Sequence, residues 1–115
     1  MEVRPKTIKV YQRGDGNLPF VKWIKGLHDL RGKQKIEARI DRVRSGNLGD
    51  HRSVGEGALE LRIQYGPGYR VYLGQEDNTF VIILLGGDKS SQDDDIKKAK
   101  EYWKEYQKEK SHANG

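Results

Sequence analysis

Apolar and polar positions alternate in three segments of the chain, and a fourth segment is apolar throughout. The alternating segments are residues 7–13, 58–65 and 69–74, and alternation of this kind predicts strands with one buried face. Residues 79–85 are almost continuously apolar, as expected of a central strand that is covered on both faces. Residues 46–57 show no period and contain four glycines, so we predict a loop there.

Three further segments carry apolar residues at helical spacing. Their stripes are Phe20, Trp23, Ile24 and Leu27; Ile36, Ile40 and Val43; and Ile96, Ala99, Trp103 and Tyr106. We expect Asn17 or Asp15 to cap the first helix, with Pro19 in its first turn. We expect Gly46 to end the second. The first two helices would form a helical hairpin.

The predicted order is β-α-α-β-β-β-α, an α+β fold in which helices pack on a small, mostly antiparallel sheet. We expect residues 1–110 to form a single domain and residues 111–115 to fray as a C-terminal tail. The glycines at 66 and 68 flank Pro67, which predicts a three-residue hairpin loop. In that register Tyr65 pairs with Tyr69.

Composition narrows the class of protein. A length of 115 residues suits one domain. The chain has no cysteine, so disulfides, thiolate metal sites and thiol catalysis are excluded. It has no apolar stretch long enough to cross a membrane and no apolar segment typical of a secretion signal. We therefore expect a soluble, cytoplasmic protein with no membrane contact.

The net charge is +5, and the excess lies in the first part of the chain. Residues 1–46 contain 12 Lys or Arg and 5 Asp or Glu. Most of these cations fall on the outward faces of the two predicted helices. A basic region favours an anionic partner such as nucleic acid. The alternative is a lysine-rich surface that keeps a small protein soluble.

Familiar catalytic motifs are absent, since the chain has no phosphate-binding loop, dinucleotide fingerprint or nucleophile elbow. His28, His51 and His112 are scattered, so we expect no histidine metal site. His51 differs from the other two because it lies beside Arg52 in the glycine-rich segment. It is a candidate for a catalytic role or a contact with RNA.

The polar face of the predicted hairpin is the stronger candidate. There Arg62 and Arg70 would be diagonal neighbours with Tyr72 beside them, and two guanidinium groups at that spacing can hold one phosphate. Lys89 follows the central strand and can turn toward the same face. The alternative is an ordinary solvated face on which Glu60 neutralises one arginine.

Three stretches of sequence resemble one known family. They are Glu60-Leu61-Arg62-Ile63, the run Tyr-Gly-Pro-Gly-Tyr-Arg-Val-Tyr at 65–72, and Gly-Gly-Asp-Lys-Ser at 86–90. The chain resembles the RelE/ParE superfamily of bacterial toxins, and within it the phage-derived, Gp49-like or HigB-type group known as addiction module killer proteins. The resemblance covers nearly the whole order of elements, so it implies a RelE-like toxin domain.

The resemblance implies a toxin of a type II toxin–antitoxin system, most commonly an mRNA interferase. Such a protein is a metal-independent endoribonuclease without a cofactor, which cleaves mRNA on the ribosome by attack of a ribose 2′-OH. Its partners would be the ribosome, mRNA and a small helix-turn-helix antitoxin. The catalytic candidates are Arg62, Arg70, Lys89, His51 and Tyr72. The candidates for binding RNA or the ribosome are Lys33, Lys35, Arg39, Arg42 and Arg52.

The resemblance does not assign the acid or the base of such a reaction. RelE carries two lysines just before its Leu-Arg pair, where this chain has Ala58 and Glu60. His51, Glu60, Tyr72 and Lys89 are the candidates. Two other functions are open: a ParE-like inhibitor of DNA gyrase, and a degenerate toxin that only binds its antitoxin.

Overall fold

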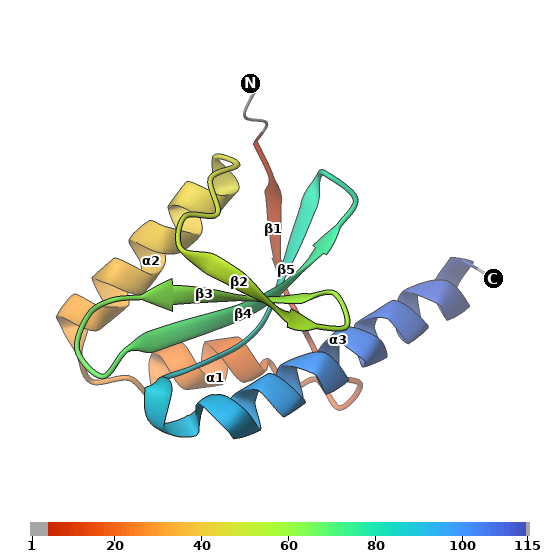
Figure 1. Cartoon of the computed structure of the whole chain (residues 1–115). Helices are drawn as coiled ribbons and strands as arrows, with labels where there is room; N and C mark the ends of the chain where they lie inside the picture. The colour runs from red at the N-terminus through yellow and green to blue at the C-terminus, as the bar shows by residue number, and fades with distance from the viewer. Residues whose placement is uncertain (1–4, 115) are drawn as a thin grey trace.

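The computed structural model describes the backbone of residues 5–114 and the side chains of residues 5–111. It has an α+β fold, as predicted, with three helices and a five-stranded sheet (Figure 1). The elements in chain order are β1 (Thr7–Val10), α1 (Pro19–Lys25), α2 (Leu30–Arg44), β2 (His51–Gly55), β3 (Ala58–Ile63), β4 (Tyr69–Glu76), β5 (Phe80–Gly87), the 3-10 turn η1 (Lys89–Ser91) and α3 (Gln92–Asn114).

The strand order in the sheet is β1-β5-β4-β3-β2. β1 runs parallel to β5, and every other neighbouring pair is antiparallel, so the sheet is mixed but mostly antiparallel. The backbone of residues 111–114 continues α3, although the sequence predicts fraying from Ser111. Residues 1–4 of the predicted domain and Gly115 of the predicted tail lie outside the described residues, as does the side chain of His112.

The sheet separates two apolar clusters, one on each face. α1 and α2 cover one face, where Phe20 and Ile36 pack with Val71 and Val81. α3 covers part of the other face through side chains that include Trp103. β5 is apolar throughout because it contributes to both clusters. α1 lies over β5 while α2 lies over β3 and β4, so the two helices share a face of the sheet.

The segment 46–57, predicted as a loop, contains the edge strand β2, so that prediction is wrong. Gly55 pairs with Ala58, and the two residues between them, Glu56 and Gly57, both have positive φ angles of 56° and 87°. This is the backbone of a tight two-residue hairpin turn. The strand has no periodic signal because residues 51–53 are all exposed.

The predicted register of the next hairpin is wrong by two residues. Ile63, and not Tyr65, pairs with Tyr69, so that Arg62 lies directly opposite Arg70. Residues 64–68 form the loop, in which Gly66 and Gly68 have φ angles of 56° and 79°. A shift of two residues leaves every side chain on its predicted face. The apolar face is confirmed, but the face predicted to be polar contains the buried residues Glu60 and Tyr72.

The helix caps differ in part from those predicted. Leu18 occupies the N-cap of α1 and Pro19 its first position, but no side chain caps the helix, so the assignment to Asn17 or Asp15 is wrong. α2 begins earlier than its apolar stripe indicates because Asp29 caps it, accepting from the Gly32 amide at 2.9 Å. Gly46 follows the end of α2 with a φ of 96°, as predicted.

Candidate functional site

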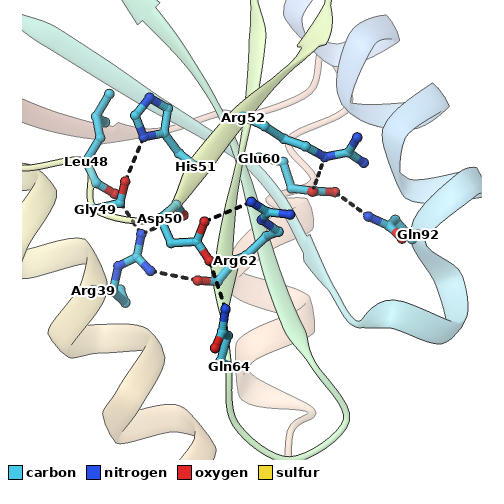
Figure 2. Close-up of polar contacts among 10 residues, drawn as sticks. All are labelled: Arg39, Leu48, Gly49, Asp50, His51, Arg52, Glu60, Arg62, Gln64 and Gln92. Carbon is cyan, nitrogen blue, oxygen red and sulfur yellow. Dashed lines mark hydrogen bonds and ion pairs between the residues drawn. The ribbon is translucent and has the colours of Figure 1, made fainter.

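Arg62 and Arg70 lie side by side on the face of the sheet that α3 covers only in part. Like charges directly opposite each other repel unless an anion lies between or beside them. Arg62 has such an anion, since its Nη2 is 2.9 Å from Asp50 Oδ1 (Figure 2). Arg70 forms no ion pair within the described part of the chain, and the Nε of each arginine is buried without a hydrogen-bond partner. The pair is therefore suited to accept an anion.

Lys89 reaches the same end of the sheet from a different element. Its backbone amide donates to the Pro67 carbonyl in the β3–β4 loop at 3.4 Å. A Cβ on Gly68 would lie 3.4 Å from Lys89 Cβ and 4.0 Å from Arg70 Nη1. The structure thus brings together three cations that the sequence predicts, Arg62, Arg70 and Lys89.

A buried ion pair lies next to these cations on the same face. Glu60 is fully buried, and its two oxygens accept from Arg52 Nε at 2.8 Å and from Gln92 Nε2 at 3.0 Å (Figure 2). Burial raises the pKa of Glu60, but the hydrogen bonds from Arg52 and Gln92 outweigh burial and hold the pKa below its usual range. Glu60 is therefore an anion that joins β2, β3 and the start of α3.

Tyr72 lies opposite Glu60 in the β3–β4 pair and is completely buried. Among the described residues, its hydroxyl has no hydrogen-bond partner. Burial and the nearby negative charge of Glu60 both raise the pKa of Tyr72 well above its usual value. The phenol therefore stays protonated at neutral pH and cannot act as a base in that state.

His51 does not join this group. It pairs with Leu61 in the sheet, whereas Arg52 pairs with Glu60, and successive side chains of a strand point to opposite faces. Its Nδ1 lies 2.8 Å from the Gly49 carbonyl oxygen, and Figure 2 shows the ring directed away from Arg52 and Arg62. The structure therefore separates His51 from the other catalytic candidates.

Arg39 is not on the outward face of α2, where the sequence places it. It is 8% exposed, and its guanidinium donates to the carbonyl oxygens of Arg62, Leu48 and Asp50 at 2.7–3.0 Å. These bonds tie the segment before β2 to β3. Arg39 is thus a structural residue, because its side chain is committed to the protein's own backbone.

The other predicted binding residues have different surroundings. Lys35 and Arg42 are exposed on α2, and Lys33 is half-buried. The side chain of Arg52 is 47% exposed but is paired with Glu60. The basic face of the helices is therefore smaller than the sequence predicts.

Periodicity does not reveal three residues that shape the site. Asp50 orients Arg62 and Gln92 holds Glu60, and both lie outside any apolar pattern. Asp95 is buried against Gly87, where a built Cβ would lie 1.9 Å from its Oδ2, and burial raises its pKa. The glycine in the apolar strand is the signal for that contact, since a strand glycine marks a close approach.

Two further observations concern the part of the chain that the structure describes. Within it, no group of three or more His, Cys, Asp or Glu side chains is arranged to hold a metal ion. Its helices are all too short or too polar to cross a membrane.

A comparison with known proteins finds a relative in Haemophilus influenzae. The chain is 55% identical over 83 residues to a Haemophilus influenzae protein described as uncharacterized, and the match covers 72% of this chain and 84% of that protein. No protein-family model matches the chain, and no solved structure matches it. The chain belongs to the same family as the Haemophilus influenzae protein.

Proposed function

We propose that this protein is the toxin of a type II toxin–antitoxin system and cleaves mRNA on the ribosome without a metal ion. The observation that carries the proposal is the grouping of Arg62, Arg70 and Lys89 at one end of the sheet. The resemblance of the hairpin and of the segment 86–90 to RelE-like toxins supports it. The proposal implies a cytoplasmic protein with a small helix-turn-helix antitoxin as its partner.

The proposed reaction needs a concentrated positive charge. The ribose 2′-oxygen attacks the adjacent phosphorus and the 5′-oxygen leaves, so the products are a 2′,3′-cyclic phosphate and a free 5′-hydroxyl. The phosphorane that forms on the way carries additional negative charge on its non-bridging oxygens. Donors placed beforehand around such oxygens stabilise the transition state more than the ground state.

The two arginines would supply that stabilisation. Arg70 has no carboxylate partner among the described residues, so its charge is available to a phosphate. Arg62 is held by Asp50, which fixes the position of its guanidinium. Lys89 is exposed and adds a third positive charge. It can stabilise the negative charge that develops on the leaving 5′-oxygen.

Glu60 and Tyr72 lie on the same face of β3 and β4 as Arg62 and Arg70 and constrain the proton transfers. The Tyr72 phenol, with its raised pKa, is a donor and not a base. Glu60 is an anion, yet both of its oxygens are occupied by Arg52 and Gln92. We therefore assign to this protein the electrostatic part of catalysis and give neither group the role of the base.

The test is cleavage of a defined mRNA on programmed ribosomes by the purified protein, with the new 5′ ends mapped by primer extension. We expect 5′-hydroxyl ends with the wild type and a rate about 100-fold lower with Arg70→Ala, the usual loss when one transition-state donor is removed. The matched control is Arg44→Ala, which removes an arginine from a surface pair with Asp41 and should leave the rate unchanged.

Two results would overturn the proposal. One is intact message at high protein concentration. The other is equal cleavage by the wild type and Arg70→Ala when both variants show the same circular dichroism melting curve. Inhibition of gyrase supercoiling without new RNA ends would assign the protein to the ParE-like function instead.

A further inference from the structure

A groove of about 700 Å³ runs between α2 and the β3–β4 hairpin. Lys35 and Arg42 line its helical wall and lie seven residues apart, on one face of α2. Ala38 lies between them and is exposed. Its short side chain leaves the space between the two cations open.

Positive charge dominates this groove. Its lining includes Lys35, Arg39, Arg42 and Arg62 but a single carboxylate, Asp50, which is already paired with Arg62. Within the part of the chain that the structure describes, Arg39 donates only to neutral carbonyl oxygens, and its Nε has no partner. The charge of this buried guanidinium is therefore not neutralised by a carboxylate bonded to it. Low-dielectric walls focus such a field on whatever enters the groove.

An aromatic ring lies at one end of the same groove. Tyr65 belongs to the loop between β3 and β4 and is only half-buried. The Lys35 amino group lies 5.2 Å from the centre of its ring. A flat ring beside cations is the combination that single-stranded nucleic acids use, because bases stack on the ring while phosphates meet the charges.

We infer that this groove binds a single-stranded RNA segment next to the scissile phosphate, with phosphates on Lys35 and Arg42 and a base against Tyr65. Arg62 lines the groove and also lies opposite Arg70 in the sheet, so this arginine links the two sites. The inference rests on the proposed function for the choice of RNA as the ligand. An acidic protein segment would meet the same charges but has no need of the aromatic ring.

The experiment measures binding without cleavage. A fluorescein-labelled hexaadenylate with 2′-O-methyl riboses is titrated with the full chain and followed by fluorescence anisotropy, between about 50 and 200 mM salt. The methylated oxygen cannot attack the phosphate. Affinity for this probe therefore reports on the groove whether or not the protein is a nuclease.

The charge variant is Lys35→Gln with Arg42→Gln. Each phosphate contact contributes about 0.7 to the slope of log affinity against log salt for a single strand, so the variant should lower the slope by about 1.4. We expect an affinity about tenfold weaker at the lowest salt, on the order of the loss that counterion release implies for two contacts. The matched control is Lys97→Gln with Lys104→Gln, an exposed pair at the same spacing on α3, which should leave the slope unchanged.

Two uncharged variants test the ring and the space. Tyr65→Leu should weaken binding about fivefold, the lower end of the effect of one stacked base, while Tyr65→Phe should bind as the wild type does. Ala38→Leu fills the groove from an exposed helical position and should also weaken binding, with no change in charge or melting temperature.

The outcomes separate this inference from the proposed function. If the charge variant and Tyr65→Leu bind the probe as the wild type does and mRNA is still cleaved, the groove does not bind RNA, but the proposed nuclease function is unaffected. If binding depends on the groove residues but the protein cleaves no mRNA, the groove binds RNA and the proposed nuclease function is wrong. If Tyr65→Leu binds RNA normally and an oligoglutamate peptide displaces the probe in proportion to its charge, the groove is a docking surface for an acidic protein, and the inference is wrong.

Discussion

Removal of Arg52 should destabilise the protein at neutral pH much more than its position on an exposed edge strand indicates. The Arg52→Ala variant removes the cation that pairs with Glu60, whose carboxylate is fully buried in the wild type, and leaves the hydrogen bond from Gln92 in place. The loss of one partner from a buried ion pair costs about 3–5 kcal/mol. The Arg52 side chain is 47% exposed, so solvent already screens part of the interaction, and we expect a loss of about 2 kcal/mol.

The effect of removing Arg52 should depend on pH, because it acts through the charge of Glu60. In the wild type the pKa of Glu60 lies below its usual 4.5, so the stability that Glu60 provides is complete above that pH and lost as the pH falls through the lowered pKa. Without Arg52, burial dominates and raises the pKa above the unfolded value. Protonation of Glu60 then removes the cost of its buried, unpaired charge, so the variant becomes less destabilised as the pH falls. The difference in stability between the two proteins should therefore shrink as the pH is lowered from 7 toward 4.5.

The assay is urea unfolding followed by tryptophan fluorescence, since Trp23 and Trp103 pack on opposite faces of the sheet. Arg44→Ala is the control because Arg44 and Asp41 form an exposed ion pair, and its loss should change the stability by less than about 0.5 kcal/mol. Equal losses in the two variants, or a difference between Arg52→Ala and the wild type that does not depend on pH, would refute this account of Glu60.

Two other predictions concern the scaffold. Gly86→Ala should lose about 3 kcal/mol of stability, because a Cβ there would lie 2.1 Å from Trp23 Cε3; an unchanged urea midpoint would show that α1 can move away at no cost. Arg39→Leu should lose about 3 kcal/mol of stability, because it removes the hydrogen bonds to three carbonyl oxygens. Arg42→Gln should melt as the wild type does. Equal melting temperatures for these two variants would contradict the structural role of Arg39.

The sequence predicts the helices and strands whose apolar residues follow a regular pattern. β3, β4 and the three helices each carry an apolar stripe, and β5 is apolar because both of its faces are covered. β2 has no such pattern, since residues 51–53 are exposed on both sides of the strand. Its pairing depends on the Glu56-Gly57 turn and on Arg52 meeting Glu60, which no periodicity expresses.

The candidate site was predicted in part for a similar reason. Arg62 and Arg70 stay on the predicted face because the error in register is two residues, and a strand repeats every two. The orientation of Arg39 could not be predicted, because its bonds go to the backbone of a segment without regular spacing. The same holds for His51, whose direction depends on the unpredicted strand β2.

The residues at the end of β5 contribute both to the stability of the fold and to the geometry of the candidate site. Before Gly86, the pairing of β5 with β4 shifts register between Tyr72 and Leu73. Gly86 and Gly87 then leave room for Trp23 on one face and Asp95 on the other, so helices from both sides pack directly on the backbone. β5 ends beside the hairpin loop, where η1 begins and places Lys89 next to Gly68. A bulkier residue at 87 would push Asp95 away and, because η1 leads directly into α3, would shift Lys89 relative to Gly68.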